Sequence, residues 1–438
     1  MDPDSAHGET PAAAAAPTIT RRPTTYTARS LLTLPTPLPS QEAPRPGPAA
    51  QSSSSSLSRR TMTNHRVLIS AAIVALLLAA CTAAAAITIT RKQQQQQHKK
   101  PSAASAGCDV FGAGSWVADE SYPLYDSASC PFIRAEFDCK RFRRPDTAYL
   151  KFRWQPSPPC SQLPRFDGAA LLRMWSGKKV MFVGDSLALN QYESLLCLIH
   201  AAVPGATTTV SPRSGKIDPS TTVAFQEYNV TLVYYLTHYL VDLVNEKAGR
   251  ILKLDSIDQA RNWLGADVLV FDSWHWWPRT GPTQPWDYME EDGKLVKDMD
   301  RSLAFTKALN TWARWVDANL VQTSTKVFFQ GISPSHYKGQ EWGASAKKTC
   351  MGETEPLNST APYPGGPIPQ QAILKSALAG MAKPVYLLDF TFLSQLRKDA
   401  HPTKYDGGIF GGDCTHWCIA GLPDTWNVLF YAALLGQS

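Results

Sequence analysis

The sequence has no tryptophan before residue 108, although the chain of 438 residues contains 13. Residues 1–66 are instead rich in Ala, Pro, Ser and Thr. A segment with so few aromatic side chains buries too little apolar surface to offset the entropy that a chain loses on folding. We therefore predict a disordered tail over residues 1–66 and one large folded unit after residue 107.

The folded part also lacks an excess of charge of either sign. Residues 1–107 contain 11 Lys and Arg against 4 Asp and Glu, whereas the rest of the chain contains 32 against 33. The overall net charge of +6 therefore belongs to the N-terminal region. Nucleic-acid binding requires a basic surface, so a nearly neutral domain argues against a nucleic-acid partner.

Long apolar runs are absent except for one. Residues 67–87 contain no charged side chain, and their length fits a membrane-spanning helix of about 20 residues. Basic residues flank this run on both sides, so they do not decide its orientation. An alternative start at Met62 would make the run a cleaved signal peptide. We predict a signal anchor at 67–87, a low-complexity stem at 88–107 and a lumenal domain at 108–438, with residues 1–66 in the cytoplasm.

No cysteine pair has the C-x-x-C spacing with histidine partners that marks a zinc site, so we expect no metal. Cys81 lies within the apolar run, and the other eight cysteines form an even set. An even set in a secretory protein favours disulfides, although spacing alone leaves the pairing open. Asn229 and Asn358 each begin an N-x-Thr glycosylation sequence, which fits a lumenal domain.

Short apolar runs alternate with longer amphipathic ones, which predicts an α/β fold around a buried parallel sheet. No internal repeat is visible. Residues 108–166 contain four cysteines and no long helical pattern, so we expect a disulfide-tied N-terminal lobe there. The predicted core strands are residues 179–184, 267–271, 326–330 and 385–389, and the clearest helical spacing covers 297–320.

Ser186 follows the first of these strands directly, in the sequence Gly184-Asp185-Ser186, and a helical pattern runs from residue 187 to 200. Active sites in open α/β sheets form beyond the carboxyl ends of the strands. The unpaired N–H groups at the start of a helix could stabilise an oxyanion at this position. The alternative is that Ser186 only caps the helix.

Asp413 and His416 are three positions apart in the sequence, a spacing that would place both side chains on one face of a helical turn. The carboxylate could then accept from one imidazole nitrogen and leave the other to take a serine proton. A histidine without a catalytic role is the alternative for His416 alone. Cys414 and Cys418 flank the pair, so disulfides would hold this turn rigidly. We predict a Ser186–His416–Asp413 triad.

Several motifs together resemble the plant trichome birefringence-like proteins, over residues 108 to the C-terminus. They are CDVFGAGSWV from Cys108, YPLYDSASCPFI, RPD at 144–146, YLKFRWQP at 149–156, GDS at 184–186, the WHWW cluster at 274–277 and the Asp413-x-x-His416 ending. The resemblance implies an SGNH-hydrolase-like three-layer α/β/α sandwich and a type II, single-pass Golgi anchor. It also implies disulfides between Cys108 and Cys160, Cys130 and Cys197, Cys139 and Cys418, and Cys350 and Cys414.

The resemblance further implies O-acetylation of a cell-wall polysaccharide, with xylan as our chosen acceptor. Ser186 would be the nucleophile, His416 the base and Asp413 the residue that orients it. Acetyl-CoA would serve as a co-substrate, and no cofactor would be bound. Two alternatives use the same sequence features: a pectin or other polysaccharide acetylesterase with the same triad, and a non-catalytic glycan-binding protein.

We predict that the substrate contacts lie around the serine and the tryptophan cluster, at Gly184, Asp185, Asp272, His275, Trp276 and Trp277. Flat tryptophan faces could contact sugar rings, although core packing is the alternative. Many relatives have Asn where this chain has Asp272. An ionised carboxylate cannot donate to an oxyanion, so either backbone N–H groups near Ser186 complete the oxyanion hole or Asp272 has another role.

Overall fold

The structure is a computed structural model that describes residues 109–160, 163–211, 220–358 and 363–436. The predicted tail (1–66), anchor (67–87) and stem (88–107) lie outside these ranges and stay predictions. Within the described ranges, no helix combines the length and the apolar character needed to cross a bilayer.

A seven-stranded sheet forms the centre of the domain, in the order β13-β12-β9-β3-β6-β5-β4. The first five strands are parallel; four of them, β13, β12, β9 and β3, are the predicted core strands, whereas β6 was not predicted. The last two run antiparallel at one edge. These two strands were not expected, because polar residues dominate them and an edge strand needs no continuous apolar run. The strand bounds are β3 (Lys179–Gly184), β4 (Thr208–Ser211), β5 (Ser220–Phe225), β6 (Val230–Leu236), β9 (Val268–Phe271), β12 (Lys326–Gln330) and β13 (Val385–Leu388).

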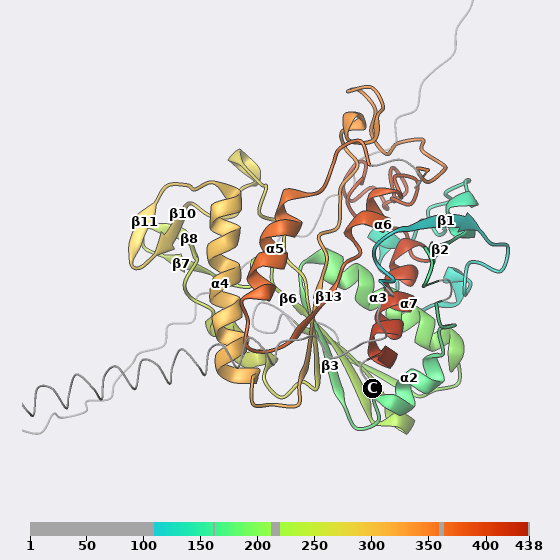
Figure 1. Cartoon of the computed structure of the whole chain (residues 1–438), viewed down its shortest axis with the longest axis horizontal. Helices are drawn as coiled ribbons and strands as arrows, with labels where there is room; N and C mark the ends of the chain where they lie inside the picture. The colour runs from blue at the N-terminus through green and yellow to red at the C-terminus, as the bar shows by residue number, and fades with distance from the viewer. Residues whose placement is uncertain (1–108, 161–162, 212–219, 359–362, 437–438) are drawn as a thin grey trace, which may run out of the picture. The chain divides into compact units, whose positions relative to one another are not determined.

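The sheet separates two hydrophobic cores because successive side chains of a strand point to opposite faces. In β3, Val180 and Phe182 join one core, whereas Met181 and Val183 join the other. Helices cover both cores, which gives the predicted α/β/α sandwich (Figure 1). On the first face lie α2 (Gly168–Met174), α3 (Ser186–Ala202), α6 (Thr391–Gln395) and α7 (Leu422–Gly436), and on the second lie α4 (Arg301–Leu320) and α5 (Pro369–Ala379).

The two long predicted helices are confirmed. The pattern over 187–200 forms α3, and that over 297–320 forms α4. The helix α4 begins at Arg301 because Asp300 caps it: the carboxylate accepts from the Leu303 N–H at 2.9 Å. The apolar residues Leu309, Trp312, Val316 and Leu320 lie on the buried face of α4, and the Asp300 cap determines where the helix starts.

The N-terminal lobe is tied to the domain by disulfides, as predicted. Its regular elements are the antiparallel pair β1 (Gly114–Ala118) and β2 (Phe152–Pro156), with three short 3-10 helices between them, η1 (Ser127–Ser129), η2 (Ala135–Phe137) and η3 (Ala148–Lys151). Cys130–Cys197 joins the lobe to α3, and Cys139–Cys418 joins it to the loop before α7. The predicted Cys108–Cys160 bond involves Cys108, which lies outside the described residues.

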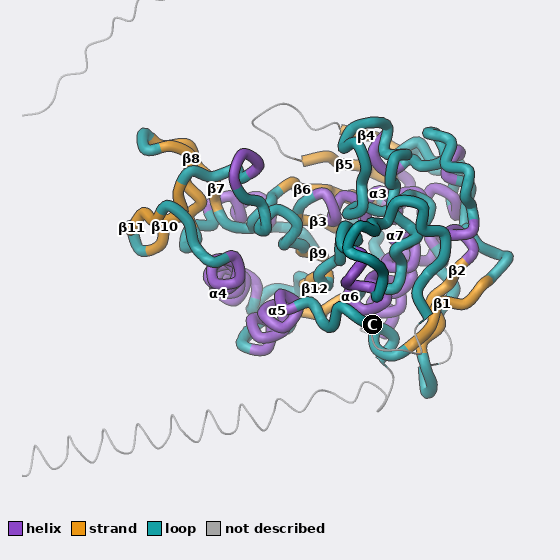
Figure 2. The backbone as a smooth tube through the Cα atoms, turned by 90° about the horizontal axis from the view of Figure 1, so that it is seen from above, coloured by secondary structure: helices purple, strands orange, loops and turns teal. Residues whose placement is uncertain are grey.

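A smaller four-stranded sheet lies beside α4, on the side of the domain away from β1 and β2 (Figure 2). Its strand order is β11-β10-β8-β7, and β10 runs parallel to β8. Its short strands carry too little apolar alternation to stand out in the sequence. The bounds are β7 (Asp242–Glu246), β8 (Gly249–Lys253), β10 (Tyr288–Glu291) and β11 (Lys294–Val296).

Candidate active site

Ser186 is the first residue of α3, directly beyond the carboxyl end of β3. Asp185 is the N-cap, and its carboxylate accepts from the Leu187 N–H at 2.9 Å. Gly184 is required by space, because a Cβ there would lie 2.6 Å from the Asp272 carbonyl oxygen. The N–H of Ser186 has no partner within the helix because it belongs to the first turn. The serine therefore stands where an oxyanion donor is available.

The structure brings the three predicted triad side chains together. Ser186 Oγ lies 2.7 Å from His416 Nε2, and His416 Nδ1 lies 2.6 Å from Asp413 Oδ2. His416 and Asp413 are 5% and 1% exposed, so little water competes for their contact. A serine joined to an imidazole that is held by a carboxylate is the arrangement required for proton removal from the hydroxyl.

The predicted helical turn at residues 413–416 is wrong. Asp413 instead forms an isolated β-bridge with Thr403, and bends follow it. Its Oδ1 accepts from the N–H groups of Thr415 at 2.8 Å and His416 at 3.1 Å. An Asp side chain that bonds the backbone two and three residues onward competes with helix formation. The same carboxylate thus shapes the loop with one oxygen and orients the imidazole with the other.

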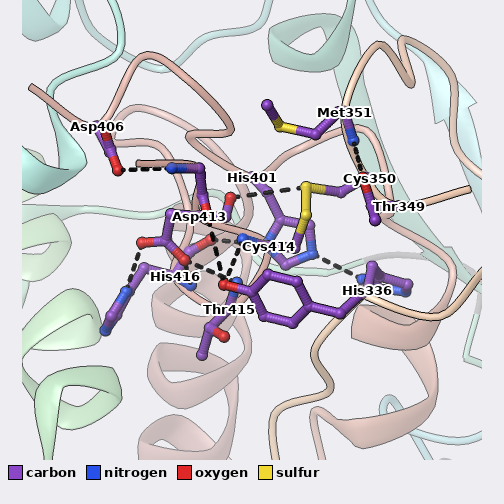
Figure 3. Close-up of a disulfide and its surroundings, with 12 residues drawn as sticks. His336, Thr349, Cys350, Met351, His401, Asp406, Asp413, Cys414, Thr415 and His416 are labelled. Carbon is purple, nitrogen blue, oxygen red and sulfur yellow. Dashed lines mark hydrogen bonds and ion pairs between the residues drawn. A yellow bond between two sulfur atoms is a disulfide. The ribbon is translucent and has the colours of Figure 1, made fainter. Parts of the chain in front are cut away.

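Two disulfides hold this loop, as the positions of Cys414 and Cys418 predicted. Cys350–Cys414 lies next to Asp413 and Thr415 (Figure 3), and Cys139–Cys418 lies just beyond His416. The catalytic loop is therefore covalently joined to two other parts of the domain. Such a loop is well ordered before substrate arrives, which general-base catalysis requires.

Two buried histidines, His401 and His336, form a hydrogen-bonded chain to the backbone of this loop (Figure 3). His401 Nδ1 lies 2.7 Å from the His416 carbonyl oxygen, and His401 Nε2 lies 2.7 Å from His336 Nδ1. His336 Nε2 lies 3.0 Å from the Gln395 carbonyl oxygen. Both imidazoles are completely buried. The backbone of His416 is thus linked through two rings to the segment after β13.

The carboxyl group of Asp413 is ionised over the whole ordinary pH range. Burial raises its pKa, but the charge and hydrogen bond of His416 and the N–H groups of Thr415 and His416 outweigh burial, so the pKa is about 2. A negative Asp413 stabilises the imidazolium that forms when His416 takes a proton.

Asp185 and Asp272, both predicted to contact substrate, are 0% and 2% exposed, so the structure places them beneath the site rather than at its surface. Asp185 accepts from the Leu187 and His275 N–H groups and so fixes the loop after β9. Burial, and then the charge and hydrogen bond of Asp185, raise the pKa of Asp272 well above its usual value. The raised pKa favours the neutral carboxyl group of Asp272, which can donate a hydrogen bond as an asparagine amide does. Gly184, also buried, serves packing rather than binding.

His275 lies beside the triad, with its ring centroid 5.6 Å from that of His416. Burial, and then the nearby His416 and Arg279, lower the pKa of His275 to about 4, although Asp185 opposes this shift. His275 and Thr415 line a groove of about 460 Å³ whose other walls include Trp274, Tyr337, Lys338 and Tyr363. The predicted position of His275 at a substrate-sized opening is thus supported.

The structure does not support the other two predicted tryptophan contacts. Trp277 is fully buried, and its ring packs edge-on against Tyr239 and Phe305. Trp276 is contacted by His238, with ring centroids 3.8 Å apart, and by the Arg279 guanidinium at 3.4 Å. Two groups so close to one ring cannot share a face, so both faces are covered. Of the cluster, Trp274 is the tryptophan that lines the groove.

Phe410 is the aromatic residue that the sequence analysis missed. Its ring lies 5.4 Å from that of His416, at an interplanar angle of 23°, and its side chain is 53% exposed. Phe137, which is fully buried, contacts His416 at the same ring distance. The imidazole is therefore packed by one buried and one exposed phenylalanine. One feature of the sequence could have pointed to Phe410: the apolar pair Ile409-Phe410 lies between two glycine pairs, directly before Asp413.

The two predicted glycosylation sites are placed where a glycan could attach. Asn229 ends a short 3-10 helix in left-handed conformation and is exposed, and Asn358 is exposed as well. Their modification stays a prediction.

Comparison with known proteins agrees with this geometry. Residues 163–433 match the model of the GDSL/SGNH-like acyl-esterase family found in Pmr5 and Cas1p. Residues 106–161 match the model of the PMR5 N-terminal domain. The two matches together cover the lobe and the α/β/α sandwich.

The chain belongs to the trichome birefringence-like family. It is 55% identical over 331 residues to the trichome birefringence-like 38 protein of Arabidopsis thaliana, a match that covers 75% of this chain and 84% of that protein. It is 52% identical to the trichome birefringence-like 39 protein over 76% of this chain and 89% of the relative. The trichome birefringence protein itself is 36% identical over 75% of this chain and 56% of that protein. The match to an acyl-esterase family indicates an enzyme that acts on acyl groups.

Proposed function

We propose that the chain is an O-acetyltransferase that adds acetyl groups to hydroxyls of a plant cell-wall polysaccharide, with xylan, at O2 or O3 of its xylosyl residues, as the first acceptor to test. One observation carries the proposal: Ser186 Oγ lies 2.7 Å from His416 Nε2, and His416 Nδ1 lies 2.6 Å from Asp413. The family match supports acyl chemistry at this serine.

The first half-reaction acetylates the serine. His416 Nε2 takes the hydroxyl proton while Ser186 Oγ attacks the carbonyl carbon of the donor, for which we propose acetyl-CoA. We place the negative oxygen that forms against the N–H of Ser186, which has no partner within the helix. When the tetrahedral intermediate collapses, the bond from the carbonyl carbon to the donor sulfur breaks and His416 returns the proton to the leaving thiolate.

The second half-reaction passes the acetyl group to a sugar. A hydroxyl of the polysaccharide gives its proton to His416 Nε2, and its oxygen attacks the acetyl carbon. The bond to Ser186 Oγ then breaks, and the serine recovers the proton from His416. Asp413 stays ionised throughout and stabilises each imidazolium state.

We also propose that the protein works as a Golgi membrane protein with its catalytic domain in the lumen, held by residues 67–87. The disulfides Cys130–Cys197, Cys139–Cys418 and Cys350–Cys414 support an oxidising compartment. Exposed Asn229 and Asn358 are compatible with glycosylation there.

A polysaccharide acetylesterase is the second candidate, because the matched family is described as acyl-esterase. The two activities share the acetyl-serine and differ only in whether a sugar hydroxyl or water attacks it. The full chain in detergent should be incubated with acetyl-CoA and xylo-oligosaccharides, and separately with acetylated polymers. Acetylated oligosaccharide supports the transferase, whereas release of acetate from polymer without any transfer supports the esterase.

The serine variant controls this experiment. Ser186→Ala should abolish both activities while leaving the melting temperature nearly unchanged, because the residue it replaces is small. Full activity of this variant would exclude the proposed mechanism. Retained glycan binding by a wild-type chain that has neither activity would instead support a binding protein.

A further inference from the structure

The loop of residues 405–412, directly before Asp413, holds one aromatic ring in an exposed position. Asp406 is 1% exposed, and its carboxylate accepts from the N–H groups of Gly408 at 2.8 Å, Phe410 at 3.0 Å and Gly412 at 3.4 Å. A single buried carboxylate therefore organises the loop from inside. The side chain of Phe410 is 53% exposed although its backbone is held in this way.

Glycines give the loop its shape. Gly407, Gly408, Gly411 and Gly412 all have positive φ, of 72°, 75°, 70° and 133°. Residues with a Cβ rarely adopt these conformations, so the path of the loop depends on glycine at these positions. Ile409 and Phe410 are consequently the two side chains at its tip.

The position of Phe410 relative to the base limits what can reach the serine. A hydroxyl must come within about 2.6–3.2 Å of His416 Nε2 to lose its proton there. The Phe410 ring lies 5.4 Å from the His416 ring, in a nearly parallel orientation. A sugar ring that carries the reacting hydroxyl is itself a few ångströms across, so the exposed part of Phe410 lies within reach of such a ring.

We propose that Phe410 is the acceptor platform of the enzyme: a sugar ring of the acceptor polysaccharide stacks on its exposed face while one hydroxyl reaches His416 Nε2. This inference rests on the proposed function. The negatively polarised face of an aromatic ring attracts the C–H groups of a sugar, and it offers apolar contact that a rigid backbone has already positioned.

The platform also favours transfer over hydrolysis. The acetyl group leaves Ser186 Oγ for the oxygen that loses its proton to His416, and either a sugar hydroxyl or water can supply that oxygen. Only the sugar gains binding energy from the ring, so stacking raises the local concentration of the sugar hydroxyl relative to water. The exposed ring thus contributes to the choice of acceptor rather than to acetylation of the serine.

Core packing does not explain the exposed half of this ring. Phe137 already packs the His416 imidazole and is fully buried. Ile409 offers a matched comparison, because it lies on the same loop and is 51% exposed, close to the value for Phe410. If any exposed apolar side chain on this loop affected acetyl transfer in the same way, replacing Ile409 or Phe410 by alanine would have the same effect on transfer.

The test measures how acetyl groups are divided between the sugar acceptor and water. The full chain is given acetyl-CoA and xylo-oligosaccharides, and acetylated oligosaccharide and free acetate are quantified together as acceptor concentration varies. For Phe410→Ala we expect the ratio of transfer to hydrolysis to fall about tenfold and the acceptor KM to rise about tenfold. Phe410→Trp should restore both quantities, Phe410→Leu should restore them only in part, and Ile409→Ala should stay within about twofold of wild type.

Three results would overturn the platform. The first is an unchanged ratio and acceptor KM in Phe410→Ala. The second is an equal loss in Ile409→Ala, and the third is a fall in acetyl-serine formation, measured by intact mass, as large as the fall in transfer. If the wild-type chain transfers acetyl groups and the Phe410→Ala variant does so equally well, the platform is contradicted but the proposed function is not. A wild-type chain that forms no acetylated glycan with any acceptor overturns the proposed function as well.

Discussion

The catalytic side chains illustrate how much of a site depends on single residues. Ser186 and His416 are 230 residues apart in the sequence, yet their side chains lie within hydrogen-bond distance. Asp413 contributes twice, because one oxygen orients the imidazole and the other accepts from two backbone N–H groups. Replacing one oxygen by an amide nitrogen therefore tests both contributions at once.

Asp413→Asn should reduce kcat by about 10³- to 10⁴-fold, because an amide that donates to Nδ1 holds the wrong imidazole tautomer and stabilises no imidazolium. The acceptor KM should change little, since no substrate contact is removed. Steady-state kinetics with acetyl-CoA and oligosaccharide measure both. Asp300→Asn, at the cap of α4, is the control and should keep full activity. A loss of less than tenfold in Asp413→Asn would contradict the role of the carboxylate.

Asp272→Asn should leave the melting temperature and kcat close to wild type, because an amide can donate the hydrogen bond to Asp185 that the raised pKa of Asp272 favours. Asp272→Ala should lower the free energy of unfolding by about 1–3 kcal/mol, because it leaves buried Asp185 without that partner. Denaturant unfolding of the two variants provides the comparison. Equal destabilisation of both variants would show that Asp272 is ionised in the folded protein.

Motif residues were predictable at this scale, whereas exposure was not. The strand-end serine and the Asp-x-x-His spacing predicted the triad because each residue has chemistry that requires the other two. The tryptophan contacts failed because His238 and Arg279, which cover Trp276, are set by folding and not by the motif. Phe410 was missed because a phenylalanine between glycines gives no indication of the ring against which it will lie.

Secondary-structure elements position the site through their ends. The strand β3 and the helix α3 were predicted almost to the residue, because a fully buried strand is an uninterrupted apolar run and Asp185 marks the start of the helix. The loop at 413–416 was predicted as helical and is not, because spacing cannot show that a side chain will bond its own backbone. The disulfides Cys350–Cys414 and Cys139–Cys418 hold this loop in place, although it has no regular secondary structure.

Two disulfides allow the contribution of this loop to be separated from general stability. Cys350–Cys414 and Cys130–Cys197 close segments of similar length, with sequence separations of 64 and 67. Loop-closure entropy then predicts similar losses of about 2–4 kcal/mol in the free energy of unfolding when either pair is replaced by serines. Only the Cys350→Ser, Cys414→Ser variant should also lose at least tenfold in kcat at a temperature where both variants are folded, because that bond holds the loop of Asp413 and His416.

Denaturant unfolding and steady-state kinetics of the two double variants measure these effects. Equal losses of activity would show that the bond beside the triad adds stability without positioning the base.

Two buried histidines should make the whole molecule less stable in mild acid than it would be without them. Burial lowers the pKa of His336 to about 4, and burial and the neighbouring His336 lower the pKa of His401 well below its usual value. Above about pH 6.5 both rings are neutral in the folded and the unfolded chain. As the pH falls from there towards 4, the unfolded chain takes up protons that the folded chain excludes, so stability is lost.

Between pH 7 and pH 5 His336 alone should contribute a loss of about 2 kcal/mol in the free energy of unfolding. His336→Gln removes this titration, so the difference between the two pH values should shrink by that amount even if the variant is less stable overall. Guanidinium unfolding at both pH values measures the difference. His200→Gln, at the end of α3, is the control. An unchanged difference in His336→Gln would contradict a neutral, buried ring.

The overall architecture was the most predictable level. Four of the five parallel strands, and a sheet covered on both faces, follow from apolar runs separated by amphipathic segments. The fifth parallel strand, β6, was not predicted. The small sheet of β7, β8, β10 and β11 and the antiparallel edge were not predicted, because short polar strands are stabilised by neighbours that the local sequence does not reveal.

The long separation between nucleophile and base bears on how the protein is made. As the polypeptide is synthesised, Ser186 emerges first, and 230 more residues must follow before its imidazole partner exists. The bond from Cys139 to Cys418 likewise spans 279 residues and cannot close earlier. A half-made chain consequently contains an ordinary, unreactive alcohol, so biosynthesis yields no acyl chemistry until the last part of the domain has folded onto the first.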